Sequence, residues 1–229
     1  MNIIIHGCCG KMGRVLAETA LKEHDIHILC GIDNTTDTAS SKLNFPVLSE
    51  LRAQELITDV IIDFSQPAAL KPLLCWCILT KTPVVIATTG LGPEEYRIIQ
   101  EASKQIPVFQ SANMSLGINV LSKALKLISP ILGNDFDIEI IEKHHRMKKD
   151  APSGTALLLE DSIGRSCPSH SVRAGSIPGE HTVIFAGTDE VIELTHIAYS
   201  RTIFARGALA AARFLIKQPP GLYNMNDLT

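Results

Sequence analysis

The chain has 229 residues, of which 45% are hydrophobic and 20% are charged, and its formal net charge is −3 at pH 7. A chain of this length can bury one good core or two small ones, and the composition is typical of an ordinary globular protein. The slightly acidic balance argues against broad electrostatic binding to nucleic acid. Because the apolar runs are far shorter than the roughly 18 residues of a membrane helix, we expect a cytoplasmic protein without a membrane partner.

The cysteines stand at positions 8, 9, 30, 75, 77 and 167, without a CxxC pair. Cys30 and the pair Cys75 and Cys77 lie in apolar surroundings, so we predict that they are reduced core residues. A zinc site would need two closely spaced pairs of thiolate or imidazole ligands, which His144 and His145 alone do not supply. The sequence therefore predicts no metal.

The N-terminal segment has the pattern of a strand, a glycine turn, a helix and a second strand. A β-branched run over 2–6 stops at Gly7, apolar residues at helical spacing follow over 14–24, and a second strand over 26–32 ends in Asp33. The turn has the spacing G-x-x-G-x-x-G, and Cys9 stands where a further glycine is usual. A turn of this kind binds pyrophosphate through free backbone N–H groups, although a tight turn without a ligand is the alternative.

Asp33 favours the dinucleotide interpretation of this turn. A carboxylate at the end of the second strand can accept both ribose hydroxyls of an adenosine, and it would repel a 2′-phosphate. We therefore expect NADH or NADPH as the cofactor, with a slight lean to NADH, while Lys11 could still tolerate NADPH.

The next elements indicate a parallel sheet covered on both faces. Polar residues over 34–42 predict a loop, and strands are predicted over 60–64, 83–87 and 107–110, separated by helices over 67–80 and 93–105. Small or polar groups end these strands at Ser65, Thr88-Thr89 and Ala112-Asn113, so they are candidates to line a cofactor. For Ser65, a helix cap is the preferred alternative.

The character of the chain changes near residue 114. We predict a helix over 116–132, a strand over 137–142, a helix over 156–165, two strands over 181–186 and 191–198, and a final helix over 203–216. Gly207 costs about 1 kcal/mol relative to alanine in a helix interior, so close packing or a later helix start is expected there. One domain should comprise 1–114 with 203–229, and a second, of α+β type, should comprise 115–202.

The stretch from Glu139 to Leu159 concentrates reactive side chains beside a predicted helix start. On a strand, His144 and His145 point in opposite directions, so at most one of them faces a given reacting atom. Pro152 suits a first helical turn, and Ser153-Gly154-Thr155 would offer free N–H groups and two hydroxyls to a carboxylate. Together with Lys148, the histidines indicate a carboxylated substrate and a proton donor.

The alternative for this stretch is a solvated, charged loop whose serine merely caps a helix. We prefer that alternative for Lys143, Arg146, Met147 and Lys149.

The run from Glu142 to Ala156 resembles the signature of dihydrodipicolinate reductases, E-x-H-H-x-x-K-x-D-x-P-S-G-T-A. The resemblance extends over nearly the whole chain. It includes the glycine turn, Asp63-Phe64-Ser65, Ala87-Thr88-Thr89-Gly90, Ser111-Ala112-Asn113-Met114-Ser115 with Gly117 and Asn119, Arg173-Ala174-Gly175, and Gly179-Glu180-His181-Thr182.

The resemblance implies a homotetrameric enzyme of lysine and diaminopimelate synthesis that reduces a cyclic imine dicarboxylate with NAD(P)H to tetrahydrodipicolinate. Its fold would be α/β, with a doubly wound, Rossmann-type parallel sheet and a smaller α+β domain for substrate and oligomerisation.

The resemblance also implies roles for individual residues. His144 would be the proton donor or acceptor and Lys148 a second donor. His145, Gly154 and Thr155, with Ser153 in the same cradle, would bind the substrate, and Arg201 is either a further substrate ligand or a surface arginine. The cofactor would contact residues on three strand ends: Gly7, Cys8, Cys9, Gly10, Lys11, Met12, Asp33, Ala87, Thr88, Thr89, Ser111, Ala112, Asn113 and Met114. Closure of one domain on the other should bring the two halves of the site together.

The chain departs from the family pattern in Cys9 and in two short segments, the loop after Asp33 and the segment 166–172. One rival function is an NAD(H)-sensing regulator, which would need no His-His-x-x-Lys run. Another is a two-domain dehydrogenase acting on an open-chain carbonyl, which the Pro-Ser-Gly-Thr cradle disfavours.

Overall fold

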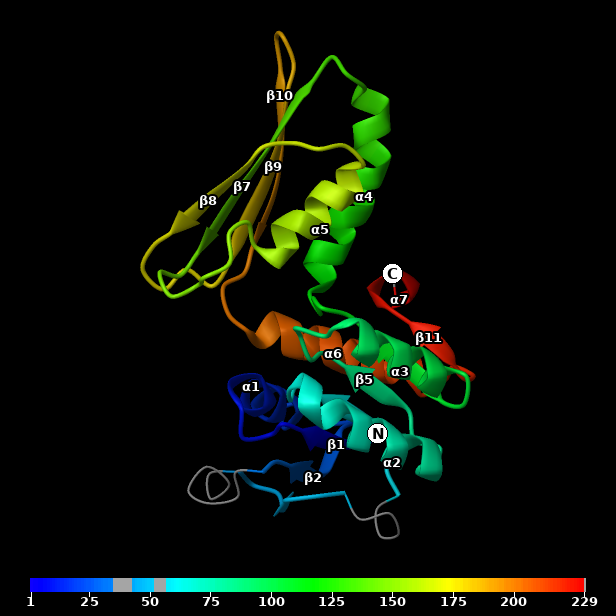
Figure 1. Ribbon diagram of the computed structural model, residues 1–229. Helices are drawn as coiled ribbons and strands as arrows, with labels where there is room; N and C mark the ends of the chain where they lie inside the picture. The colour runs from blue at the N-terminus through cyan, green and yellow to red at the C-terminus, as the bar shows by residue number, and fades with distance from the viewer. Residues whose placement is uncertain (35–42, 52–56, 229) are drawn as a thin grey trace. The chain divides into compact units, whose positions relative to one another are not determined.

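The computed structural model describes residues 1–34, 43–51 and 57–228 and divides into two compact units. The first unit is Met1–Met114 together with Thr202–Thr229, and the second is Ser115–Arg201 (Figure 1). Apart from Asn34, the predicted loop over 34–42 lies outside the described residues. Among the described helices, none combines the length and the apolar character that crossing a membrane requires.

The first unit is built on a seven-stranded sheet in which neighbouring strands run parallel. The strand order is β11-β6-β5-β4-β1-β2-β3. The strands are β1 (Asn2–His6), β2 (His27–Ile32), β3 (Val47–Leu48), β4 (Val60–Asp63), β5 (Val84–Ile86), β6 (Pro107–Gln110) and β11 (Gly221–Tyr223). This is the doubly wound architecture that the continuous apolar runs predicted.

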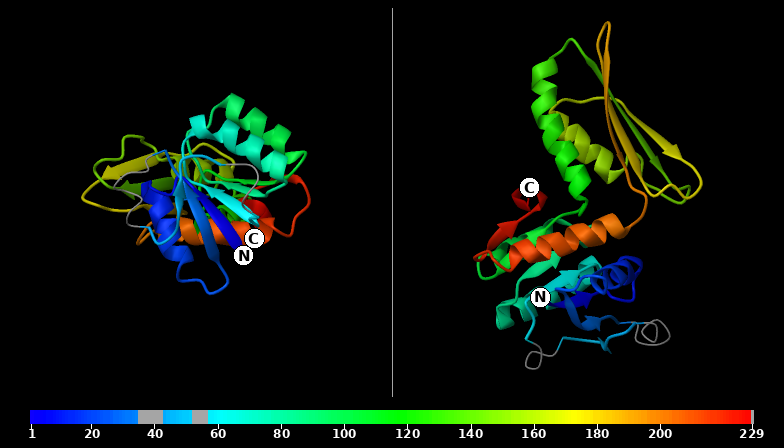
Figure 2. Two further views of the ribbon diagram at one scale, coloured as in Figure 1. Left: turned by 90° about the horizontal axis from the view of Figure 1, so that it is seen from below. Right: turned by 180° about the vertical axis from the view of Figure 1, so that it is seen from behind.

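Helices cover both faces of this sheet. Successive side chains of one strand enter different cores: Ile3 and Ile5 pack in one core with Leu16, while Ile4 packs in the other with Leu73. The first core includes helices α1 (Lys11–Ala20) and α6 (Thr202–Leu215), and the second includes α2 (Leu70–Thr80) and α3 (Pro93–Ser103) (Figure 2). A single turn, η2 (Pro67–Ala69), precedes α2, and α7 (Met225–Leu228) follows the last strand.

Gly207 on α6 lies directly against the backbone of Met114. A Cβ added to Gly207 would lie 1.6 Å from the carbonyl oxygen of Met114. The glycine lies in the interior of the helix, so the expectation of close packing is confirmed and that of a late helix start is wrong.

The second unit is a four-stranded sheet with two helices on one face (Figures 1 and 2). The order is β10-β9-β7-β8, with strands β7 (Asp137–His144), β8 (Ser169–Arg173), β9 (Glu180–Ala186) and β10 (Val191–Ile197). Strand β7 pairs antiparallel with β9 and parallel with β8. Helices α4 (Leu116–Leu132) and α5 (Gly154–Ile163) bury Leu125 and Leu159 against Ile140 and Phe185 of the sheet.

Several local predictions were wrong. The strands β3, β8 and β11 and the short α7 were not foreseen, because β3 and β11 are very short and β8 is mostly polar. Cys75 is exposed while Cys77 is buried, since two residues along a helix turn the side chain by about 200°. Ser65 caps no helix, because Gln66 is the residue that precedes the turn at Pro67. Pro152 precedes Ser153, the N-cap of α5, rather than opening the helix.

Candidate active site

The turn between β1 and α1 is shaped by glycines that leave no room for a side chain. Gly7 has a φ of +78°, and a Cβ there would lie 2.8 Å from the carbonyl oxygen of Phe64. A Cβ on Gly13 would lie 2.1 Å from the carbonyl oxygen of Gly7. Helix α1 begins directly after Gly10, and within the described chain no side chain caps it. The first N–H groups of α1 therefore remain available to an anion.

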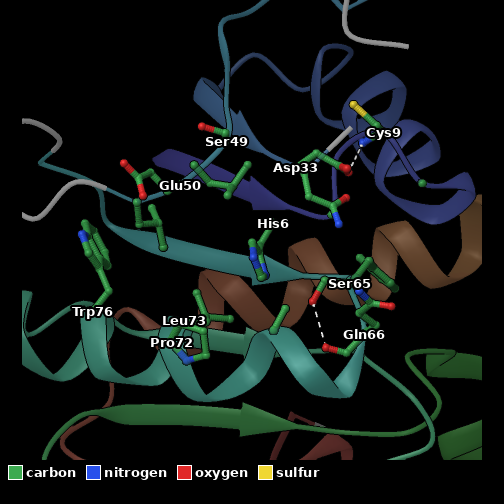
Figure 3. Close-up of a pocket in the computed structure, with 17 residues that line it drawn as sticks. His6, Cys9, Asp33, Ser49, Glu50, Ser65, Gln66, Pro72, Leu73 and Trp76 are labelled. Atoms are coloured by element: carbon green, nitrogen blue, oxygen red, sulfur yellow. Dashed lines mark hydrogen bonds between the residues drawn. The ribbon is translucent and has the colours of Figure 1, made fainter. Parts of the chain in front are cut away.

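A pocket of about 720 Å³ in the first unit opens beside this turn (Figure 3). Residues at the ends of β1, β2 and β4 form part of its wall, and the start of α2 forms another part. Its lining residues are His6, Gly7, Cys9, Gly10, Ile32, Asp33, Asn34, Ser49, Glu50, Leu51, Phe64, Ser65, Gln66, Ala69, Pro72, Leu73 and Trp76. The volume and the mixed apolar and polar wall suit part of a dinucleotide.

Two carboxylates, Asp33 and Glu50, line this pocket. Among the described lining residues there is no lysine or arginine. Asp33 also accepts a hydrogen bond of 2.9 Å from the backbone N–H of Cys9, which ties the end of β2 to the glycine turn. Figure 3 shows this contact at one end of the pocket and Trp76 at the other.

A buried carboxylate braces the strand ends beneath the pocket. Asp63 is fully buried and accepts hydrogen bonds from Nδ1 of His6 at 2.7 Å, from Oγ1 of Thr88 at 2.7 Å and from the backbone N–H of Ser65 at 3.1 Å. These contacts join the carboxyl ends of β1, β4 and β5. His6 and Asp63 were not predicted as site residues, although both stand at strand ends.

The predicted cofactor residues divide into two sets. Gly7, Cys9, Gly10 and Asp33 line the pocket. The others do not: Cys8, Lys11, Met12, Ala87, Thr88, Thr89, Ser111, Ala112, Asn113 and Met114. The side chain of Cys8 lies against Gly31, where a Cβ would be 2.4 Å from its Sγ, and burial raises the pKa of its thiol to about 12. Cys8 therefore supports the turn from within the core.

One group of side chains in the described part of the chain has the spacing of a possible metal site. The Sγ atoms of Cys8 and Cys9 and a carboxylate oxygen of Asp33 lie within 4.8 Å of one another. The expectation of no metal stays a prediction.

The second unit carries His144 at the end of β7. Alternate residues of this strand point to one face, so Glu142 and His144 are buried while Lys143 and His145 are only partly buried. Because β7 ends at His144, the opposition of the two histidines stays a prediction. Burial lowers the pKa of His144, against the opposing influence of the Glu142 carboxylate.

Lys148 lies in the loop that follows β7. Its Nζ is 2.8 Å from Oδ2 of Asp150. Burial is the main cause that lowers the pKa of His144, Glu142 opposes it, and the positive charge of Lys148 lowers the pKa further by a smaller amount. The neighbouring Arg146, Met147 and Lys149 are exposed, as predicted, whereas Lys143 is half-exposed and its Nζ lies 2.6 Å from Glu180. The loop thus presents one partly buried cation near the imidazole.

At the start of α5, Ser153 is placed differently from what the sequence predicted. Ser153 is buried: its N–H donates to Glu142 at 3.2 Å, and its Oγ accepts from the N–H of Ala156 and lies 3.0 Å from Nε2 of His181. The prediction that Ser153 offers a free N–H and hydroxyl is therefore wrong, because the helix cap turns it inward. Gly154 is exposed and Thr155 is partly exposed.

His181 is a buried neighbour of His144 that was not predicted as a site residue. The two imidazole rings meet edge to face with centroids 5.0 Å apart. Burial, with a smaller contribution from His144, lowers the pKa of His181 to about 4. His181 is therefore neutral at pH 7. The run Gly179-Glu180-His181-Thr182 carried the only sequence signal for it.

The structure brings a buried imidazole close to the start of α5. His144 and the backbone before α5 both contact the carboxylate of Glu142, and the charge of Lys148, which pairs with Asp150, acts on His144. Such a cluster can hold a carboxylate and exchange a proton with a bound molecule. Arg201, the other predicted candidate, is exposed at the end of the second unit.

Family comparisons cover both units. The model "Dihydrodipicolinate reductase, N-terminus" matches residues 1–114, and the model "Dihydrodipicolinate reductase, C-terminus" matches residues 117–229. A 4-hydroxy-tetrahydrodipicolinate reductase of Caldanaerobacter subterraneus subsp. tengcongensis is 48% identical, covering 100% of this chain and 98% of the relative. One from Clostridium tetani is 47% identical over 99% of this chain and 96% of its own length.

Solved structures support the fold. A dipicolinate-bound dihydrodipicolinate reductase from Paenisporosarcina superposes with a TM-score of 0.82 at 24% identity, covering 99% of this chain and 98% of that one. GenD2 from gentamicin A biosynthesis, solved with NAD, has a TM-score of 0.67 at 11% identity, covering 100% of this chain and 90% of that one.

Proposed function

Since the chain belongs to the dihydrodipicolinate reductase family, we propose that His144 exchanges the proton of the reaction and that Lys148 is a second donor. The chain is an NAD(P)H-dependent reductase that converts 4-hydroxy-tetrahydrodipicolinate to tetrahydrodipicolinate in lysine and diaminopimelate synthesis. The observation that carries the proposed roles is the placement of a buried imidazole beside a cation and a helix start.

The bound dinucleotide supplies the hydride. The free N–H groups at the start of α1 would hold its pyrophosphate, and Asp33 would accept its ribose hydroxyls. The proposed preference for NADH is supported by the two carboxylates in the pocket, Asp33 and Glu50, and by the lack of a cation among the described lining residues. The carboxylate of Asp33 would repel a 2′-phosphate.

The substrate carboxylates would bind to His145, Gly154 and Thr155. Gly154 is the first residue of α5, so its N–H points out of the helix start, where the dipole favours an anion. Ser153 is not included, because its N–H donates to Glu142 and its hydroxyl contacts His181 within the second unit. Arg201 is a further candidate ligand, supported only by its exposure.

The proposed mechanism uses no metal. Loss of the 4-hydroxyl as water takes a proton from the adjacent ring carbon, and a proton returns to the ring after hydride addition. His144 and the cationic Lys148 can carry out these acid-base steps, and Lys148 can stabilise negative charge. EDTA followed by desalting should leave turnover within about twofold of the untreated enzyme. A loss of activity that zinc restores would overturn this part of the proposal and would direct attention to Cys8, Cys9 and Asp33.

We also propose a homotetramer that uses the sheet of the second unit. Helices α4 and α5 cover one face of this sheet, and the other face exposes apolar side chains, among them Val172, Val191 and Ile197. Light scattering should give four times the mass of one chain, and Ile197→Glu should lower that mass, because a charge there opposes association. A wild-type monomer at micromolar concentration would contradict the proposal.

The direct test of function is a coupled assay. Dihydrodipicolinate synthase supplies the unstable substrate, and the loss of nicotinamide absorbance is followed with NADH or NADPH. We expect turnover with both dinucleotides and a higher kcat/KM with NADH. Turnover of open-chain carbonyls instead would favour the dehydrogenase alternative, and dinucleotide binding without any turnover would favour a regulator.

A further inference from the structure

A fully buried carboxylate lies beneath the proposed proton donor. Glu142, on β7, accepts hydrogen bonds from Nδ1 of His144 at 2.5 Å, from Oγ of Ser171 at 2.7 Å and from the N–H of Ser153 at 3.2 Å. Arg173 donates to both of its oxygens, at 2.8 and 2.6 Å. Side chains from β7 and β8 and the backbone before α5 therefore converge on one carboxylate.

The surroundings keep Glu142 ionised. Burial alone would raise the pKa of the carboxyl, but the hydrogen bonds from Arg173, Ser171 and His144 outweigh it and lower the pKa to about 2. An ionised carboxylate only accepts hydrogen bonds. The two-pronged contact with Arg173 compensates its buried charge and fixes its plane.

An acceptor at Nδ1 determines which nitrogen of His144 is left for chemistry. Because Glu142 cannot donate, the proton of the neutral imidazole must lie on Nδ1, and Nε2 carries the free lone pair. The backbone at Gly179 lies next to that second nitrogen, where a Cβ would be 3.2 Å from Nε2. Glycine at position 179 thus keeps the edge of the ring free of a side chain.

The same carboxylate holds the start of α5. The N–H of Ser153 reaches Oε1 of Glu142, and Oγ of Ser153 caps the helix whose first residues are Gly154 and Thr155. Arg173 also donates to the carbonyl oxygen of Asp150, in the loop that carries Lys148. Any shift of Glu142 would move the proton donor and the helix start together.

We propose that Glu142, held in place by Arg173 and Ser171, is a positioning residue. It keeps the proton of the neutral His144 imidazole on Nδ1, and it fixes the position of that imidazole relative to the start of α5. The inference rests on the proposed role of His144 in proton exchange. It assigns a task to Arg173 and Ser171, which touch Glu142 rather than His144.

The test is Glu142→Gln, read by kinetics and by NMR. The amide can donate to Nδ1, which allows the imidazole proton to move to Nε2, so kcat should fall about 100-fold while the KM for the dinucleotide stays within about twofold. Nitrogen NMR of His144 in the wild type should show a protonated Nδ1 at neutral pH. In the variant, the signals should shift towards the other tautomer.

The pH profile separates positioning from a merely structural role. The charged and titratable groups around His144 are Glu142 on its own strand, Arg173 on β8, His181 on β9 and Lys148 in the following loop. The carboxylate stabilises the imidazolium, so its removal lowers the pKa of His144. If the imidazolium donates the proton, the alkaline limb of kcat/KM should move to lower pH in Glu142→Gln, whereas simple loss of folded enzyme would leave the limb in place.

Glu94→Gln is the matched control. Arg97 contacts both oxygens of Glu94, at 2.9 and 2.7 Å, as Arg173 does with Glu142, but the pair is exposed on α3. This control should leave kcat, the pH profile and the histidine signals unchanged.

Two outcomes are distinguishable. If His144→Ala retains normal turnover, the proposed role of His144 fails. If His144→Ala is inactive while Glu142→Gln keeps the wild-type tautomer, pH limb and turnover, the positioning inference fails alone. Should Glu142→Gln not fold, the wild-type spectrum still decides, because a neutral His144 with its proton on Nε2 overturns the proposal.

Discussion

The glycine turn of the first unit and the Glu142 cluster of the second, the two places where we propose that anionic groups bind, differ in how they are built. The turn relies on backbone N–H groups and on the absence of side chains at Gly7 and Gly13. The cluster relies on charged side chains that neutralise one another in a buried setting. The turn should therefore be sensitive to added volume, and the cluster to changed charge.

The largest effect is expected from His144→Ala. Loss of a positioned proton donor typically lowers the rate by about 10²–10⁴-fold, so kcat should fall by roughly 1,000-fold. NADH affinity, measured by fluorescence titration, should stay within about twofold, because the pocket proposed for the dinucleotide lies in the first unit. His24→Ala, at an exposed position, is the control. Near-normal turnover of both His144→Ala and Lys148→Ala would remove their catalytic role.

Gly13→Ala tests the sensitivity of the turn to volume. The added Cβ would collide with the carbonyl oxygen of Gly7 at 2.1 Å, so the turn must open and the dissociation constant for NADH should rise at least about 100-fold. Thermal unfolding of the variant shows how much of this loss is misfolding.

Gly133→Ala is the control for that change. It faces open space at a φ of +61° and a ψ of −144°, so the substitution should cost about 1–3 kcal/mol of stability and leave affinity unchanged. An NADH affinity of Gly13→Ala within threefold of the wild type would show that the turn does not form the pyrophosphate site.

The stability of the wild type should fall in acid partly because of His181. Its pKa is about 4 in the folded chain and about 6.5 unfolded, so the unfolded chain binds the proton first. This contribution is fully present above pH 6.5 and is lost as the pH falls towards 4. By pH 4.5 the loss of stability should amount to about 2.5 kcal/mol.

His181→Gln removes that titration. Urea unfolding at pH 7 and 4.5 should therefore show a smaller acid loss in the variant by about that amount. Equal acid losses in the wild type and the variant would mean that His181 is not held neutral in the folded state.

Asp33→Asn should give the smallest effect. The substitution removes the charge but keeps a hydrogen-bond acceptor for the N–H of Cys9. The ratio of kcat/KM for NADPH over NADH should rise about 10-fold, because the repulsion of a 2′-phosphate is lost. A wild-type preference for NADPH would overturn the interpretation of Asp33. An unchanged ratio in the variant would mean that another residue, such as Glu50, determines the dinucleotide preference.

Periodicity and turn chemistry, both local properties, determined the frame of this protein. β-branched runs ending at glycines or acids marked β1, β2 and β4, and the alternation after Asp137 marked β7, which ends at His144. The motif from Glu142 to Ala156 located the proposed chemistry. These features could be predicted because each depends on residues only a few positions apart.

The tertiary structure decided which buried polar groups meet. The register of β7 with β8 places Ser171 opposite Glu142 and Arg173 opposite His144, and no local pattern predicted β8. The same pairing brings Arg173 to Glu142, and the cap of α5 turns Ser153 inward, towards that carboxylate and His181. A buried charge is stable only when its partners are in place. Arg173, the partner of Glu142, comes from a strand some 30 residues further along the chain. The sequence alone could therefore identify His144, but not the residues that hold it in position.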